Sequence, residues 1–162
     1  MPRLEYAPGV EGTEIHRVMS LVPEPRQKWR ELDRTLRLSP VLDLTLKEDV
    51  RQALAANSGC AFCASVGTPR ESANAFHEPR VALAIAYAEM LRTPADIDAS
   101  TLEILKQEFT EPEIVELTCW SLFLIASQGF GAVMGVAAAT DAERVAYHDD
   151  RSVASSTAQS NA

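Results

Sequence analysis

The sequence predicts an all-α protein, a single bundle of about seven helices. Apolar residues recur at helical spacing in several stretches, and many of these stretches begin with a capping residue or a proline suited to a first helical turn. No alternating strand pattern of useful length occurs, and the chain contains neither Asn-Gly nor Asp-Gly, the dipeptides typical of hairpin turns. A length of 162 residues fits one domain with a sizeable core.

The first part of the chain predicts four helices. A short helix around residues 15–22 is interrupted by Pro23 to Pro25, and a second follows with Trp29, Leu32 and Leu36 on one face. A third is expected to begin at Ser39-Pro40, or alternatively at the capping box of residues 45–48, and to end near residue 57. A fourth helix carries the cysteines and stops at Gly67.

The second part predicts the remaining helices from their start signals. Residues 68–71 read as a helix start, and Pro79 opens a helix to about residue 91. Residues 100–103 cap the next helix, and residues 110–113 form a capping box for a long last helix to about residue 139. The helical domain is expected to span residues 1–148, and the Ser- and Ala-rich residues 149–162 are expected to form a flexible tail.

The charge and the cysteine content argue against several classes of protein. The net charge of −8 argues against nucleic acid or an anionic membrane as the main partner. Three cysteines are too few for a secreted disulfide scaffold, and the N-terminus lacks the apolar segment of a signal peptide. We therefore expect a cytoplasmic protein.

One uncharged stretch, residues 117–140, is long enough to span a bilayer. It contains several polar residues and lacks a positively charged flank on its N-terminal side, which favours a buried core or subunit-interface helix over a membrane span. Gly131 and Gly135 form a small-xxx-small pattern that allows helices to approach closely. We expect this helix to be buried, partly against other subunits of a homo-oligomer.

Cys60 and Cys63 form a single CxxC motif, which in an intracellular protein more often indicates redox chemistry than structure. Gly59 precedes the motif and suggests that a helix begins there, where its N-terminus would stabilise a thiolate, most of all on Cys60. The alternatives are an inert pair or half of a zinc site completed by His77 and Cys119, although no second CxxC exists. Otherwise Cys119 is expected to be a small core residue. No metal or cofactor motif is found.

Two further residues are candidates for moving a proton. Glu48 lies on the helix before the motif and could accept a proton from a buried thiol, although it could equally be part of the capping box with Thr45 or a solvated charge. His77 could fold back towards the thiols or could lie on the surface.

Taken together, these residues resemble a known family. Glu48, eleven intervening residues and Cys60-Ala-Phe-Cys63 precede the segment of residues 109–118, Phe-Thr-Glu-Pro-Glu-Ile-Val-Glu-Leu-Thr, which opens a long apolar helix. This order is similar to the alkylhydroperoxidase D-like branch of the carboxymuconolactone decarboxylase superfamily, over roughly residues 14–139. The resemblance implies an all-α fold assembled as trimers or hexamers. It also implies peroxidase or disulfide-reductase activity that uses a hydroperoxide and a dithiol reductant.

The resemblance also implies roles for individual residues. Cys63 would attack the peroxide, Cys60 would resolve the sulfenic acid, and Glu48 would belong to a proton relay with a histidine. That histidine stands four residues after the second cysteine in the family, where this chain has Gly67. The relay would then need His77. Gly67→His is expected to increase the rate provided that the helix tolerates it, because a side chain at a left-handed C-cap costs about 1 kcal/mol. The alternative is a binding or redox-sensing homo-oligomer with a degenerate site.

Overall fold

A computed structural model describes residues 2–6, 9–67 and 78–147, and within these residues it contains helices and no strands, which confirms the all-α prediction. The elements are α1 (Glu14–Met19), α2 (Pro23–Leu38), α3 (Leu44–Ala56), α4 (Ala61–Ser65), α5 (Pro79–Met90), the 3-10 helix η2 (Pro94–Asp96), α6 (Ala99–Leu105) and α7 (Glu111–Met134). Residues 141–147 are also helical. The helix start expected at residues 68–71 and the tail 149–162 lie outside the described residues.

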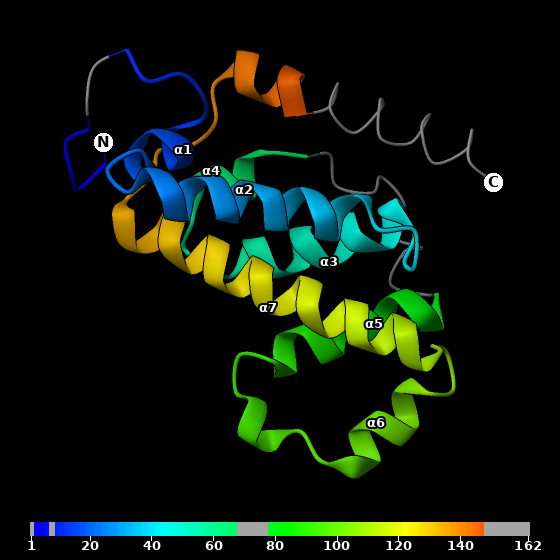
Figure 1. The fold of residues 1–162 in the computed structure, drawn as a ribbon. Coiled ribbons are helices and arrows are strands. Elements are labelled where there is room, and N and C mark those ends of the chain that lie inside the picture. The colour runs from blue at the N-terminus through cyan, green and yellow to red at the C-terminus, as the bar shows by residue number, and fades with distance from the viewer. Residues whose placement is uncertain (1, 7–8, 68–77, 148–162) are drawn as a thin grey trace.

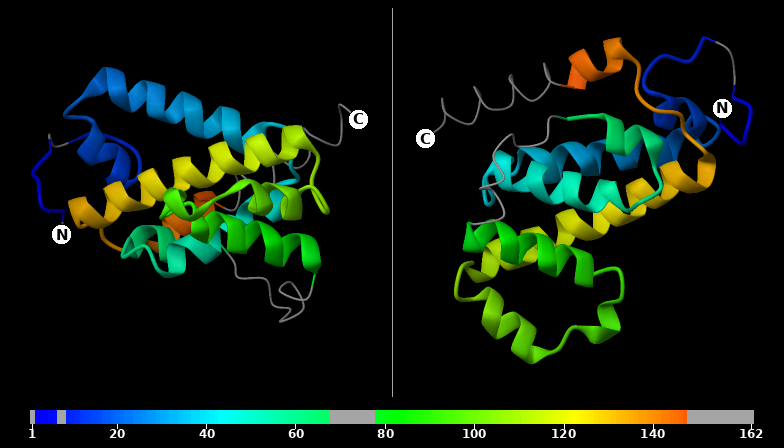
Figure 2. Two further views of the ribbon diagram at one scale, coloured as in Figure 1. Left: turned by 90° about the horizontal axis from the view of Figure 1, so that it is seen from below. Right: turned by 180° about the vertical axis from the view of Figure 1, so that it is seen from behind.

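The long helix α7 is the centre of the bundle. It runs along α2 and α3, while α5 and α6 lie towards its N-terminal end and α1 lies near its C-terminal end (Figures 1 and 2). The main core forms where α3, α5 and α7 meet, and Val50, Leu54, Ala84 and Leu117 are completely buried there. Burial of apolar surface from these three helices supplies most of the driving force for the fold.

Two helices start at an aspartate that the sequence analysis did not select. Asp43 caps α3 because its side chain accepts a hydrogen bond from the Leu46 amide at 2.8 Å, so the starts expected at Ser39 and Thr45 are wrong. Asp98 caps α6 in the same way through the Thr101 amide, in place of Ser100. An aspartate satisfies an orphan amide of the first turn at least as well as a hydroxyl does.

The boundaries of α7 are set by local signals. The expected capping box is present, with Thr110 and Glu113 satisfying each other's backbone amides. The helix ends at Met134 rather than near residue 139, because Gly135 takes a left-handed conformation with φ of 66° and the Val136 amide bonds to the Gly131 carbonyl. This is the glycine-terminated arrangement common at helix C-termini.

By length and composition, α7 is the one helix among the described residues that could cross a membrane. Its inner face instead binds the rest of the bundle. The Trp120 indole donates to the Lys47 carbonyl at 3.0 Å, and the Gln128 amide donates to the Arg51 carbonyl at 3.1 Å. These contacts join α7 to α3 and make it a core helix, as expected.

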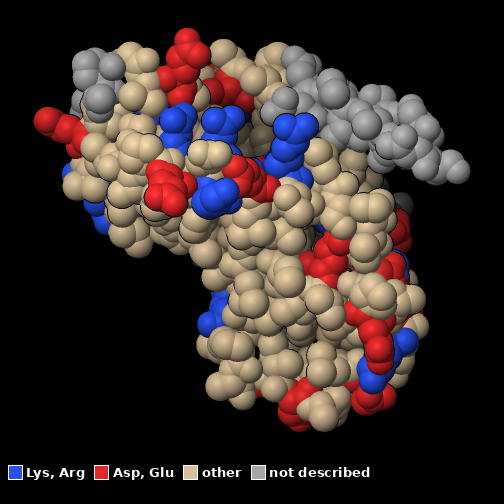
Figure 3. Space-filling model, in the orientation of Figure 1, with Lys and Arg blue, Asp and Glu red and all other residues tan. Residues whose placement is uncertain are grey.

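The outer face of α7 is exposed in the single chain. Val115, Leu122 and Val133 are exposed there, and so is Cys119, so the expectation that Cys119 lies in the core is wrong. Figure 3 shows largely uncharged surface over the middle of α7, below the charged side chains of α2. The helix is apolar on both faces, but the bundle covers only one of them.

A buried ion pair connects α3 to α7 and to the end of α2. Lys47 is 2% exposed and pairs with Glu116, and its ammonium group also donates to the carbonyls of Leu36 and Ser39, each at 2.7 Å. Glu116 accepts hydrogen bonds from the Ser39 hydroxyl and from the Leu42 amide. Because both charges are fully partnered, this pair holds the junction of the three helices together.

Candidate dithiol site

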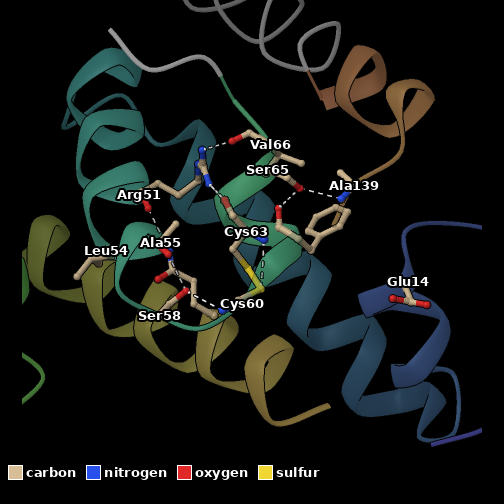
Figure 4. Close-up of a disulfide and its surroundings, with 12 residues drawn as sticks. Glu14, Arg51, Leu54, Ala55, Ser58, Cys60, Cys63, Ser65, Val66 and Ala139 are labelled. Carbon is tan, nitrogen blue, oxygen red and sulfur yellow. Dashed lines mark hydrogen bonds between the residues drawn. A yellow bond between two sulfur atoms is a disulfide. The ribbon is translucent and has the colours of Figure 1, made fainter. Parts of the chain in front are cut away.

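Cys60 and Cys63 form a disulfide across the first turn of α4, with 5.3 Å between their Cα atoms. Cys60 is the N-cap of α4, and its sulfur accepts a hydrogen bond from the Cys63 amide at 3.2 Å (Figure 4). Gly59, with φ of 74°, lets the chain turn from the end of α3 into this helix. The sequence-based placement of the two cysteines at a helix start is therefore confirmed.

The disulfide lies against α7 at Gly131, where the helix has no side chain. A Cβ atom placed on Gly131 would lie 2.5 Å from the Cys60 sulfur and 3.7 Å from the Cys63 sulfur. The two cysteines belong to a small apolar cluster with Ile15 and Met19 of α1. Gly131 thus lies at a close contact, as expected, but the contact is with the disulfide of the same chain.

Both cysteines are buried, and they differ slightly in exposure. The residue Cys60 is 1% exposed and the residue Cys63 is 8% exposed. The order in which the family resemblance has them react, Cys63 with substrate and Cys60 as the resolving residue, stays a prediction.

Serine side chains fix α4 at both ends. The Ser58 hydroxyl donates to the Ala55 carbonyl and accepts from the Cys60 amide at 3.1 Å. At the other end, the Ser65 hydroxyl accepts from the Ala139 amide at 2.7 Å (Figure 4). A five-residue helix is not stable alone, and these contacts hold the cysteines in place.

Glu48 is buried beside α4 and is paired with Arg51 one turn further along α3. The Arg51 guanidinium donates to both carboxylate oxygens, each at 2.8 Å, and Gln52 and Tyr147 donate to them at 3.0 and 2.8 Å. Glu48 is 7% exposed and does not cap α3, so neither the capping-box nor the solvated alternative holds.

Arg51 connects Glu48 to the CxxC segment. It donates to the Cys63 carbonyl at 2.8 Å and to the Val66 carbonyl at 2.7 Å. Burial acts to lower the pKa of Arg51, but the hydrogen bond with Glu48 and the nearby Tyr147 and Glu48 charges outweigh it and raise the pKa. Arg51 is therefore a permanent cation that fixes the backbone on which Cys63 sits.

Tyr147 covers this pair from the helical segment 141–147. Its ring lies 5.3 Å from the Arg51 guanidinium carbon and 5.5 Å from that of Arg37, in cation–π contact with both. Burial raises the pKa of the Tyr147 hydroxyl, and the Glu48 charge acts in the same direction. Sequence reasoning missed Arg51 and Tyr147. The spacing of Arg51 three residues after Glu48 was a usable signal, whereas nothing local pointed to Tyr147.

The space next to Gly67 is occupied by neighbouring side chains, where the family that the sequence resembles has a histidine. A Cβ there would overlap the Glu48 carboxylate and lie 2.5 Å from the Arg51 Nη2 atom, and φ is 84°. The effect of Gly67→His on the rate stays a prediction, but the structure makes an increase less favourable, because the side chains of Glu48 and Arg51 occupy that space and would have to shift.

His77 lies outside the described residues. Among the residues that the structure does describe, no group of three or more His, Cys, Asp or Glu side chains is placed to hold a metal ion. The site as described therefore consists of the disulfide, Gly131 and the Glu48–Arg51–Tyr147 group.

Gly131→Ala tests the packing of the disulfide. We expect the oxidised protein to lose about 1–3 kcal/mol in free energy of unfolding, because the added methyl group overlaps the Cys60 sulfur. Urea unfolding of the oxidised and reduced forms measures the effect, which should be larger when oxidised. Gly129→Ala is the matched control on the same helix. A Cβ there meets nothing within 4 Å inside the chain, and any effect on contact with a second copy should be the same in the oxidised and reduced forms. Equal effects of the two substitutions would contradict the prediction.

Comparisons of this chain with models of known protein families, with curated proteins and with solved structures found no match.

Proposed function

We propose that the protein is a thiol-dependent oxidoreductase that reduces hydroperoxides or disulfides through the Cys60–Cys63 pair, in a reducing compartment such as the cytoplasm. The observation that carries this proposal is the closed disulfide at the start of α4, with Cys63 more exposed than Cys60. An external dithiol, either a small molecule or a protein, regenerates the reduced form.

The reaction follows thiol chemistry in three steps. The Cys63 thiolate attacks one peroxide oxygen of ROOH, the O–O bond breaks, and ROH leaves after taking up a proton. The Cys60 sulfur then attacks the resulting Cys63 sulfenic acid and displaces hydroxide, which leaves as water when Cys60 gives up its proton. The external dithiol finally reduces the Cys60–Cys63 disulfide and is itself oxidised to a disulfide.

Contacts within the site favour the reaction of each cysteine. The Cys63 amide donates to the Cys60 sulfur, a hydrogen bond that stabilises a thiolate on Cys60 when it attacks. Arg51 is bonded to the Cys63 carbonyl and brings a positive charge to that residue's backbone. Glu48 is bound to Arg51, so its role is to position that cation rather than to collect a proton.

Single-turnover kinetics test the proposal. The reduced protein is mixed with cumene hydroperoxide, and loss of thiols and of two mass units is followed with time. We expect a rate above that of free cysteine, no disulfide formation in Cys63→Ser, and a sulfenic acid on Cys63 in Cys60→Ser that dimedone captures. Cys119→Ser, which leaves the pair intact, should react as the wild type does. Reaction no faster than free cysteine would contradict a peroxidase.

A redox-sensing binding protein is the second candidate. It is favoured by the Glu48–Arg51 pair, which occupies the space where the resembled family has its relay histidine. Position 67 therefore supplies no acceptor for the Cys63 proton. In that case the disulfide would still form and break reversibly with a dithiol buffer, but hydroperoxide would be consumed only at the rate of an ordinary thiol.

A further inference from the structure

The outer face of α7 carries a continuous stripe without charge. Its residues recur at alternating spacings of four and three, which is the pattern of a and d positions in a coiled coil. The stripe consists of Val115, Cys119, Leu122, Ala126, Gly129 and Val133. Val115, Leu122 and Val133 are 62%, 45% and 61% exposed, so the single chain leaves apolar side chains in water along the whole helix.

We propose that this α7 stripe packs against the same stripe of a second copy, with the two helices antiparallel about a two-fold axis near residue 124. In this register Val115 faces Val133 of the second copy, Cys119 faces its Gly129, and Leu122 faces its Ala126. Each pair is formed twice, because the same patch serves both subunits.

The sizes of the side chains favour the antiparallel register over the parallel one. In the antiparallel pair, each of the four central layers joins a larger residue to a smaller one, Leu to Ala or Cys to Gly, so the helices keep an even separation. A parallel pair would place Leu122 against Leu122 and Gly129 against Gly129. That arrangement alternates a wide layer with a gap, which close packing does not tolerate well.

The charges at the two ends of α7 agree with this register. Glu111 stands at the N-terminal end with its side chain 83% exposed. At the C-terminal end Arg3 donates from its side chain to the Val133 carbonyl at 2.9 Å and from its backbone to the Met134 carbonyl at 2.8 Å. The antiparallel pair brings Glu111 of one copy towards Arg3 of the other, and it also aligns the two helix dipoles favourably.

The proposal is independent of the redox chemistry. A two-fold contact of this kind occurs in a dimer or in a hexamer with dihedral symmetry, and it is absent from a trimer with a single three-fold axis. The geometry therefore points away from a simple trimer.

Cysteine cross-linking tests the register directly. In the wild type the two Cys119 sulfurs should not cross-link, because ten residues of helix, about 15 Å, separate them along the axis. In Gly129→Cys, a second thiol should face Cys119 of the other copy, and mild oxidation should give a covalent dimer whose linkage mass spectrometry assigns to positions 119 and 129. The structure leaves open space at Gly129, so the chain should fold normally.

Cys119→Ser combined with Gly129→Cys is the matched control and should stay uncross-linked. Cross-linking between two Cys119 residues in the wild type, or between two thiols at position 129, would show a parallel pair and overturn the proposal. Absence of a cross-link in Gly129→Cys would overturn it as well.

Association in solution gives a second test. Sedimentation equilibrium of the wild type should show a dimer or a multiple of it at micromolar concentration. Leu122→Glu should weaken association at least 100-fold while circular dichroism keeps its helical signal, because this side chain is exposed in the single chain. A monomeric wild type would overturn the proposal. Co-sedimentation with vesicles of phosphatidylcholine and phosphatidylglycerol, lost in Leu122→Glu, would assign the stripe to a bilayer instead and would also overturn it.

Discussion

We expect Gly67→His to lower the free energy of unfolding and not to supply a proton relay. A side chain at this position overlaps the Glu48 carboxylate and approaches Arg51, so the buried ion pair must shift, and we expect a group as large as imidazole to separate it. Breaking a buried pair costs about 3–5 kcal/mol. The left-handed backbone of a residue with a Cβ adds about 1–2 kcal/mol. Urea unfolding should show the combined loss, and the rate of hydroperoxide consumption should fall with it.

A pair of alanine substitutions separates the two contributions. Gly67 and Gly9 have similar backbone angles, with φ of 84° and 78°, but a Cβ at Gly9 meets nothing within 4 Å. Gly9→Ala therefore measures the backbone cost alone, and Gly67→Ala measures that cost together with the overlap. If the two variants were equally stable, the Glu48–Arg51 pair would not be what excludes a side chain from position 67.

Lys47→Met should destabilise the protein by about 3–5 kcal/mol, because it leaves Glu116 buried without its cation. Glu116 is 9% exposed and lies at the junction of α2, α3 and α7, so its carboxylate is largely removed from solvent. The measurement is the free energy of unfolding in urea at neutral pH.

Two further variants make this expectation specific to the buried pair. Lys47→Met combined with Glu116→Gln should recover part of the loss, because a neutral amide still accepts from the Leu42 amide without a buried charge. Lys106→Met, which removes a surface partner of Glu103, should cost far less, because solvent screens an exposed pair. Similar losses for Lys47→Met and Lys106→Met would mean that burial does not determine the strength of the pair.

The elements that sequence reasoning predicted correctly depend on contacts within one or two turns. Hydrogen bonds between residues at most four apart stabilise each of these features. These features are the capping box of Thr110 and Glu113, the helix that begins at Pro79 and the CxxC at a helix start. Such bonds depend on residue type and spacing, so a sequence displays them. The starts of α3 and α6 were misplaced although they also depend on local contacts, because several neighbouring residues could each have served as the cap.

The surroundings of the dithiol were decided by the tertiary structure. The sequence by itself determined an all-α chain with two thiols one turn apart at the start of a helix, because those features follow from local spacing. Tyr147 reaches Glu48 across 99 positions of the chain, and Gly131 meets Cys60 only because α7 packs on α4. The same packing turned Cys119 outward, since the bundle covers only one side of an apolar helix. Which residues meet across helices depends on how the helices pack, and local spacing does not specify that.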